Sequence, residues 1–270
     1  MQEIVMSLYL SLKHNDKFFL IAGPCVVEDE ALMLRTAEKL QEETAKRGIF
    51  FVFKSSYKKA NRTSLNSPAG AGMEEGLRIL RKIKERFGLP ILTDVHETTE
   101  APAAAEVVDI IQIPAFLCRQ TELLLAAGRT NRIVNLKKGQ FMAPGDMQAA
   151  SEKVKSTGNE MILLTERGTS FGYHDLVVDF RSFAVLRQFD YPVIYDVTHS
   201  LQKPSLGEVS GGAPEMASMM ARAALATGKV DGLFIETHPD PLLALSDARS
   251  MLPLHLLPQL LDDCLRLYEK

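Results

Sequence analysis

The sequence predicts a single (β/α)8 barrel with a short N-terminal extension. Three observations lead to this fold class: the chain has 270 residues, short apolar segments alternate along it with longer amphipathic ones, and no linker-like stretch interrupts the alternation. Repeated βα units imply a parallel sheet with right-handed crossovers. One closed barrel of this kind takes about 250 residues, which fits the length better than two separate domains of about 150 residues.

Eight short segments have the character of buried parallel strands. They are nearly continuous runs of apolar, β-branched and aromatic residues, as expected where helices cover the sheet. We expect the strands within residues 18–23, 49–56, 90–96, 109–115, 132–139, 161–168, 192–200 and 232–238. This number of units favours a closed barrel over the alternative, a doubly wound open sheet.

The intervening segments have a helical period. Within residues 72–88, one apolar stripe is formed by Met73, Leu77, Leu80, Ile83 and Phe87, with charge on the opposite face. Residues 31–48 show a similar pattern, and Gly48 predicts the C-terminal end of that helix.

The phosphate-binding fingerprint of a doubly wound fold is missing. Gly70, Gly72 and Gly76 do not have the G-x-G-x-x-G spacing, and they follow a polar loop rather than a strand. We therefore interpret this segment as the entry to a helix. Residues 1–17 are expected to be an N-terminal extension or a cap over the closed end of the barrel, and residues 18–270 the catalytic barrel.

Composition and charge narrow the function classes. The chain is 46% hydrophobic and 24% charged, which excludes a disordered protein, and its formal net charge of -3 argues against general binding to nucleic acid or anionic membranes. Three widely spaced cysteines argue against a disulfide framework. Without an apolar run of about 18 residues or the features of a signal peptide, the expected compartment is the cytoplasm.

Polar and ionisable residues gather at the C-terminal ends of the predicted strands, where barrel enzymes carry out their chemistry. Six of them are cations, and guanidinium and ammonium groups bind phosphate and carboxylate. Any one of them alone is equally compatible with a solvated rim charge, but together they indicate substrates that carry several phosphates and carboxylates. The six are Lys54, Lys59, Arg62, Arg119, Lys137 and Arg167.

A second group of residues predicts a metal site. Cys25, His199 and Glu236 follow the first, seventh and eighth strands, which are neighbours around a closed barrel, and Asp247 lies in the next loop. A thiolate, an imidazole and carboxylates suit Zn²⁺, Fe²⁺ or Mn²⁺ better than Ca²⁺. A cysteine after a strand is also often a small buried hydrophobe, so the residue types alone leave both interpretations open.

Several longer motifs are specific enough to point to a family. They include KANRTS at 59–64 and the segments 93–97, 112–121, 135–141, 165–168, 171–173, 196–200 and 236–241. In this order they resemble the 3-deoxy-D-manno-octulosonate 8-phosphate (KDO-8-phosphate) synthase family, from about residue 19 to residue 257.

The resemblance implies a cytoplasmic, homotetrameric (β/α)8 transferase. It condenses phosphoenolpyruvate with D-arabinose 5-phosphate and water to 3-deoxy-D-manno-octulosonate 8-phosphate, releases inorganic phosphate, and serves lipopolysaccharide biosynthesis. The family has a metal-dependent and a metal-independent branch, and the latter has Asn where this chain has Cys25. The resemblance therefore implies a divalent metal ion such as Zn²⁺, Fe²⁺ or Mn²⁺ bound by Cys25, His199, Glu236 and Asp247.

The resemblance also implies which residues meet the two substrates. For phosphoenolpyruvate they are Lys54, Ser56, Lys59, Ala115 through its backbone, Lys137 and Arg167. For the sugar phosphate they are Asn61, Arg62, Thr63, Asp94, Gln202 and Ser210, with Arg119 reaching across from a neighbouring subunit. The catalytic set among them is Lys54, Lys59, Asn61, Asp94, Lys137 and Arg167.

The chain departs from the family pattern at two places. Thr63 replaces a Ser, and residues 249–251 read Arg-Ser-Met where the branch continues toward a Gln.

Three alternative functions stay open. The first alternative is 3-deoxy-D-arabino-heptulosonate 7-phosphate synthase, which uses erythrose 4-phosphate; its loop resembles KPRTS, so Asn61 argues against it. The others are a Schiff-base aldolase using Lys54 or Lys137, and an inactive barrel that serves as a binding protein.

Overall fold

Eight parallel strands close into a barrel in the computed structural model, which describes residues 2–61, 68–203 and 211–269. Each strand pairs with the next along the chain, and the last pairs with the first from Phe19 opposite Gly232 to Gly23 opposite Glu236. The strands are β1 Phe19–Gly23, β2 Phe51–Lys54, β3 Ile91–Asp94, β4 Ile110–Ile113, β5 Ile133–Lys137, β6 Ile162–Glu166, β9 Val193–Asp196 and β12 Gly232–His238. The predicted (β/α)8 barrel is confirmed.

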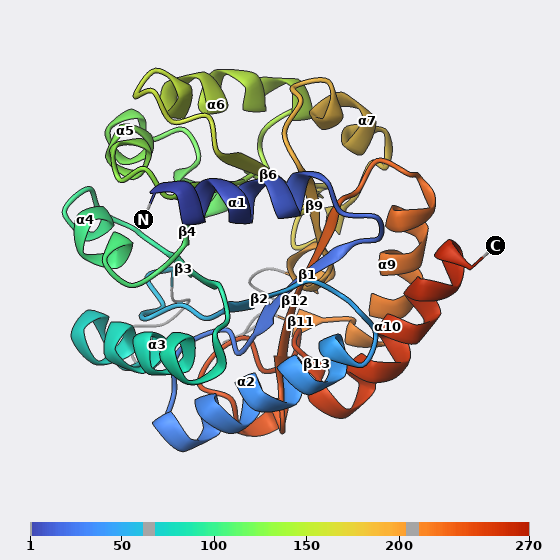
Figure 1. The fold of residues 1–270 in the computed structure, drawn as a ribbon. Coiled ribbons are helices and arrows are strands. Elements are labelled where there is room, and N and C mark those ends of the chain that lie inside the picture. Colours follow the sequence, from blue (N-terminus) through green and yellow to red (C-terminus); the bar gives the residue numbers. More distant parts are fainter. Residues whose placement is uncertain (1, 62–67, 204–210, 270) are drawn as a thin grey trace.

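Helices surround the barrel, and the first of them along the chain lies across its end (Figure 1). They are α1 Gln2–Lys13, α2 Glu30–Ala45, α3 Met73–Phe87, α4 Glu100–Ala105, α5 Thr121–Arg129, α6 Met147–Lys155, α7 Arg181–Arg187, α8 Val197–Ser200, α9 Ala217–Ala226 and α10 Leu257–Leu265. Short strands lie in the loops: β7 Thr169–Ser170 with β8 Leu176–Val177, β10 Gln202–Lys203 with β11 Gly211–Gly212, and β13 Leu252–Pro253 beside β12. Among the helices described, none combines the length and the apolarity that crossing a membrane requires.

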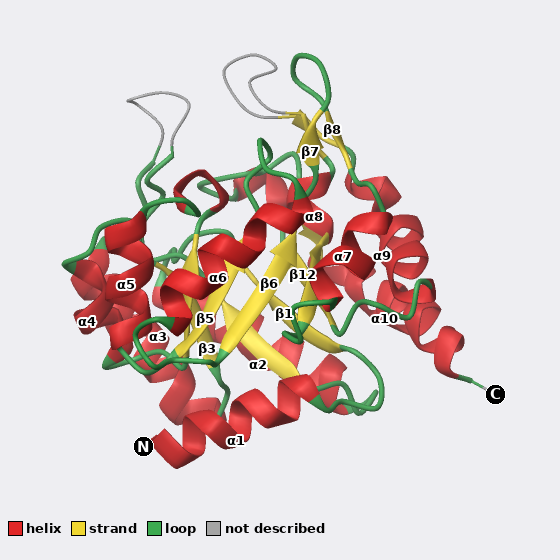
Figure 2. Ribbon diagram, turned by 90° about the horizontal axis from the view of Figure 1, so that it is seen from above, coloured by secondary structure: helices red, strands yellow, loops and turns green. Residues whose placement is uncertain are grey.

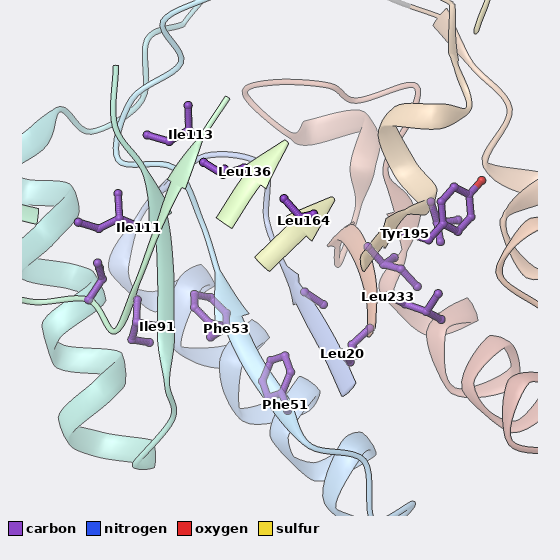
Figure 3. Packing of buried hydrophobic residues seen from close by; sticks show 14 of the residues in the cluster. Leu20, Phe51, Phe53, Ile91, Ile111, Ile113, Leu136, Leu164, Tyr195 and Leu233 are labelled. Atoms are coloured by element: carbon purple, nitrogen blue, oxygen red, sulfur yellow. The ribbon is translucent and has the colours of Figure 1, made fainter. Parts of the chain in front are cut away.

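Two apolar cores result from the alternation of side chains along the strands. The outward-facing residues, with Phe53, Ile91 and Leu136 among them, pack against the surrounding helices (Figure 3). The inward-facing residues, such as Phe19 and Ile133, form a separate cluster inside the barrel. Because both faces of each strand are buried, the strands had to be continuously apolar, which is the pattern that predicted them.

Helix α1 closes the N-terminal end of the barrel. Its buried residues Val5, Tyr9 and Leu12 belong to the same cluster as the side chains inside the barrel. In Figure 2 it lies at the end opposite the β7–β8 hairpin, so the strands open to solvent only at their C-terminal ends. The barrel's interior is therefore sealed with apolar side chains on one side and available for polar chemistry on the other.

The strand expected within residues 192–200 is shorter than its apolar run. It ends at Asp196, whose side chain accepts a hydrogen bond from the His199 backbone N–H and so caps the single turn of α8. The expected helix within 31–48 ends as predicted near Gly48, which has a left-handed backbone with φ of 60°. The segment around Gly72 leads into α3, as expected from its failure to match the phosphate fingerprint.

Candidate active site

Side chains from the C-terminal ends of the strands line one pocket. Its empty volume is about 540 Å³, including the open solvent at its entrance. The lining residues come from β1, β2, β3, β4, β5, β6, β9 and β12 or from the loops that follow them. They are Cys25, Lys54, Ser56, Lys58, Lys59, Ala60, Asn61, Asp94, Gln112, Pro114, Ala115, Phe116, Lys137, Gln140, Arg167, His199 and Glu236.

Most of the site residues predicted from the sequence therefore lie together. Asp247 and Gln202 extend the pocket's wall: Asp247 Oδ2 lies 3.1 Å from Cys25 Sγ, and Gln202 Oε1 accepts a hydrogen bond of 3.3 Å from Arg167. Arg119 is not among the described residues that line the pocket, and its carbonyl accepts a hydrogen bond from Lys153 Nζ. The predictions for Arg62, Thr63 and Ser210 fall outside the described residues.

One corner of the pocket could hold a metal ion. Donor atoms of Cys25, Glu236 and Asp247 all lie within 4.8 Å of one another, and His199 Nε2 lies 3.8 Å from Glu236 Oε2. Glu236 Oε2 is buried and has no hydrogen-bond partner within the described part of the chain. Buried donors with an unused lone pair fit a cation, and this mixture of sulfur, nitrogen and oxygen fits Zn²⁺, Fe²⁺ or Mn²⁺.

The ionisable groups in this corner shift one another's pKa. Burial raises the pKa of the Cys25 thiol, and the carboxylates of Asp247 and Glu236 raise it further, so a cation is needed to favour the thiolate. Burial alone would also raise the pKa of Glu236, but attraction by Lys54, whose Nζ lies 2.6 Å from Glu236 Oε1, lowers it. Glu236 is therefore an anion that could serve as a ligand.

The six predicted cations at the C-terminal ends of the strands, here called the cationic mouth, are partly neutralised by carboxylates. Each of its three lysines has an anionic partner: Lys54 pairs with Glu236, Lys59 with Asp247, and Lys137 with Asp196. The cations are evident from the sequence, whereas their pairing with carboxylates from other strands and loops depends on the fold.

Arg167 differs from these three paired lysines. Its side chain forms no ion pair within the described residues, it is only 5% exposed, and its buried Nη1 has no hydrogen-bond partner there. A buried guanidinium without a directly paired anion is costly, and the more distant carboxylates of Asp196 and Glu166 offset only part of the effect of burial on its pKa, which is lowered. Arg167 therefore marks the place where the pocket is best prepared for an anionic ligand.

On the other side of the pocket, Asp94 is the first member of a chain that continues through the His96 imidazole to the Glu100 carboxylate. His96 Nε2 lies 2.8 Å from Asp94 Oδ2, and His96 Nδ1 lies 3.5 Å from Glu100 Oε2. Burial opposes charge on both Asp94 and His96, but their contact outweighs it, lowering the pKa of Asp94 and raising that of His96. Asp94 Oδ1 is buried without a hydrogen-bond partner within the described residues, and so can accept one from a ligand hydroxyl.

Known proteins are similar in sequence to almost the whole chain. The profile of the DAHP synthetase I family matches residues 10–265. The chain belongs to this family. Among its curated relatives, the 2-dehydro-3-deoxyphosphooctonate aldolase of Trichlorobacter lovleyi is 55% identical over 243 residues, covering 90% of this chain and 89% of the relative. The protein of the same name from Koribacter versatilis is 54% identical over 257 residues, covering 94% of this chain and 92% of the relative. The one from Syntrophotalea carbinolica is 56% identical over 241 residues, covering 89% of this chain and 87% of the relative.

In this member of the DAHP synthetase I family, Gln112 and Gln140 also line the pocket, and neither was a predicted site residue. Gln112 accepts a hydrogen bond of 3.0 Å from Asn135, which in turn accepts one of 2.6 Å from Thr165, so three neighbouring strands form a polar layer beneath the pocket. Gln140 Oε1 is buried without a partner in the described part of the chain. The available signal was a polar residue inside an otherwise apolar strand, as at Gln112 in the run 109–115.

Proposed function

We propose that this protein condenses phosphoenolpyruvate with D-arabinose 5-phosphate and water, forming 3-deoxy-D-manno-octulosonate 8-phosphate and inorganic phosphate. The names of the curated relatives and the motifs at residues 59–64 and 236–241 support this reaction. The observation that carries the proposal is the buried guanidinium of Arg167, whose Nη1 has no hydrogen-bond partner among the described residues, in a pocket that also contains Lys54, Lys59 and Lys137.

Phosphoenolpyruvate would bind at the cationic wall of the pocket. We assign its phosphate and carboxylate to Arg167, Lys137, Lys54 and Lys59, with Ser56 and the Ala115 backbone as hydrogen-bonding groups; all of these line the pocket. A dianionic phosphate would be the anionic partner that Arg167 lacks among the described residues, and a guanidinium binds phosphate through two parallel hydrogen bonds. The lysines, already paired with carboxylates, add fixed donors at small cost in reorganisation.

Arabinose 5-phosphate would lie across the pocket from that wall. We assign its hydroxyls to Asn61, Asp94 and Gln202, because Asp94 Oδ1 is a buried acceptor without a hydrogen-bond partner in the described part of the chain. The resemblance adds Arg62, Thr63 and Ser210 for the phosphate and hydroxyl groups, and Arg119 of a second subunit. Holding two polyanions together is the main cost of the reaction, and oriented cations offset their repulsion.

The reaction forms a carbon–carbon bond and a bond from carbon to the oxygen of water, and it breaks the carbon–oxygen bond to phosphate. The two protons of water pass to the aldehyde oxygen and to the leaving phosphate. Carbon 3 of phosphoenolpyruvate attacks the aldehyde carbon of the sugar, whose oxygen gains a proton, and water adds at carbon 2 of phosphoenolpyruvate. The resulting intermediate expels inorganic phosphate by cleavage of the bond between carbon 2 and oxygen, which leaves the keto group of the product. Arg167 and the lysines hold the leaving phosphate throughout.

We assign Cys25, His199, Glu236 and Asp247 as ligands of a divalent metal ion. Such an ion would supply Lewis-acid polarisation of an oxygen or a bound water of lowered pKa. We further propose a homotetramer in the cytoplasm that serves lipopolysaccharide biosynthesis, with residues 1–17 as a cap and residues 18–270 as the catalytic domain.

A phosphate-release assay tests the reaction. Purified protein receives phosphoenolpyruvate with either arabinose 5-phosphate or erythrose 4-phosphate, before and after chelation and again with Zn²⁺ or Mn²⁺ restored. We expect phosphate release with the pentose phosphate, loss of release on chelation and recovery with metal. Turnover with erythrose 4-phosphate alone would identify the heptulosonate enzyme instead, and full activity after exhaustive chelation would exclude the metal site. A borohydride-trapped substrate adduct would indicate Schiff-base chemistry.

A further inference from the structure

Asp196 joins the candidate metal corner of the pocket to its cationic wall. It ends β9, caps the turn of α8 and is completely buried. Its Oδ1 accepts a hydrogen bond of 2.9 Å from the His199 backbone N–H, and its Oδ2 lies 2.9 Å from His199 Nδ1. The same Oδ2 accepts a hydrogen bond from Lys137 Nζ. One carboxylate thus contacts a candidate metal ligand and a candidate substrate cation.

The contact with His199 determines which ring nitrogen faces the metal corner. An imidazole whose Nδ1 carries the proton and donates it to a carboxylate presents Nε2 as its free lone pair. His199 Nε2 is the nitrogen that lies 3.8 Å from Glu236 Oε2. Carboxylates in this position fix the orientation of metal-binding histidines and raise their basicity.

The contact with Lys137 fixes a buried ammonium. Lys137 is 5% exposed, and its Nζ lies 3.5 Å from the centroid of the Phe234 ring. Held between this ring and Asp196, the lysine has little freedom, and the carboxylate supports a charge that burial alone would discourage. Without the Asp196 carboxylate, the ammonium would lose the partner of its described ion pair and keep its contact with the Phe234 ring.

We propose that Asp196 is a shared positioning residue, which orients His199 for a divalent metal ion and Lys137 for phosphoenolpyruvate. This inference rests on the proposed function, because it takes its two ligands from there. It adds that the metal and substrate sites depend on one buried carboxylate, so a single loss of charge weakens both.

The decisive variant is Asp196→Asn, and the chain offers a matched control. Asp109 is also a buried aspartate that pairs with a lysine, Lys84, and accepts a backbone N–H, that of Ile91, but it lies at the opposite end of β3 from the pocket. Asp109→Asn therefore removes the same charge from the same kind of contact away from the site.

We expect Asp196→Asn to weaken Zn²⁺ binding about 10- to 100-fold, the range found for partners of metal-binding histidines. The Zn²⁺ affinity is measured by competition with a chromophoric chelator, independently of turnover. The KM for phosphoenolpyruvate should rise at least several-fold, while the KM for arabinose 5-phosphate stays within two-fold. Asp109→Asn should lower the melting temperature and leave the Zn²⁺ affinity and both KM values unchanged.

Unchanged Zn²⁺ affinity or unchanged KM for phosphoenolpyruvate in Asp196→Asn would overturn the shared role. Should this variant not fold, Asp196→Ser keeps a side-chain acceptor for the helix cap and still lacks the charge, and the same two readouts apply. A wild-type protein that binds Zn²⁺ but does not release phosphate from phosphoenolpyruvate would refute the proposed function instead. In that case, unchanged Zn²⁺ affinity of the variant would independently refute the role of Asp196.

Discussion

The two ends of the barrel bury opposite kinds of side chain. At the N-terminal end, Val5, Tyr9 and Leu12 of α1 pack against apolar residues inside the barrel. At the C-terminal end, the buried residues are charged, as in the pairs Lys54–Glu236 and Lys137–Asp196. Apolar burial stabilises a fold by about 25 cal/mol per Å², whereas buried ion pairs barely recover their desolvation cost. One end therefore supplies stability, and the other uses it to hold charges in place.

Replacing a candidate metal ligand should have the largest effect on function. Cys25→Ala removes the only sulfur donor of the described metal corner, where Cys25 Sγ lies 3.1 Å from Asp247 Oδ2. We expect Zn²⁺ affinity to fall more than about 100-fold, because even indirect partners of a metal cost about 10–100-fold, and activity to disappear with the metal. Chelator competition and phosphate release measure the two effects.

Cys264→Ala is the matched control for this variant. Cys264 is also a fully buried free thiol, but it lies in α10. It should lose stability through the small cavity and retain Zn²⁺ binding and turnover. Equal loss of metal in both variants would show that the effect comes from removing any buried thiol and not from removing a ligand of the metal corner.

Shortening an apolar side chain at the closed end should have the largest effect on stability. Leu12 is fully buried between α1 and the barrel interior, and Leu12→Ala should lower the free energy of unfolding by about 2–5 kcal/mol. Urea denaturation gives this value. Leu10→Ala, on the exposed side of the same helix, should change it by less than about 0.5 kcal/mol. Activity of folded Leu12→Ala should equal that of wild type; lost Zn²⁺ binding would contradict the separation of the two ends.

Much of this architecture followed from the sequence because each strand is buried on both faces. The continuous apolar runs located all eight barrel strands, but not where each one ends: Asp196 caps a turn inside the run 192–200. The polar residues after the strands located the pocket. The pairing of Lys59 with Asp247 could not be predicted, since it joins residues 188 positions apart and depends on closure of the barrel. Arg119 lines no part of the described pocket of its own chain, and the expectation that it reaches the pocket of a neighbouring subunit stays a prediction.

Glu100 tests whether buried charge at the open end can also stabilise the fold when it is fully hydrogen-bonded. Its carboxylate accepts hydrogen bonds from Tyr57 Oη, from Lys58 and from the backbone N–H groups of His96 and Glu97. Burial alone would raise its pKa, but the contacts with Lys58 and Tyr57 lower the pKa from 4.5 to about 2. Glu100→Gln should lower the free energy of unfolding at pH 7 by about 1–3 kcal/mol.

The pH dependence of this loss follows from the direction of the shift. A carboxyl whose pKa is lower in the folded state contributes stability above about pH 4.5, and this contribution disappears as the pH falls toward 2. The difference between wild type and Glu100→Gln should therefore shrink over this range in urea titrations. Glu97→Gln, an exposed carboxyl in the same turn, is the control. A difference that stays constant down to pH 3 would assign the loss to packing rather than to charge.

The smallest effect is expected from an ion pair with the same chemistry on the outer surface. Glu30 contacts Lys82 and Arg78 much as Glu236 contacts Lys54, but its side chain is 30% exposed, whereas that of Glu236 is 1% exposed. Water already solvates the exposed charges, so their contact replaces interactions of similar strength and is screened by salt. Glu30→Gln should leave activity unchanged, and any shift in its melting temperature should vanish at high salt. A large decrease in melting temperature that persists at high salt would mean that burial is not what distinguishes the ion pairs of the pocket from those of the outer surface.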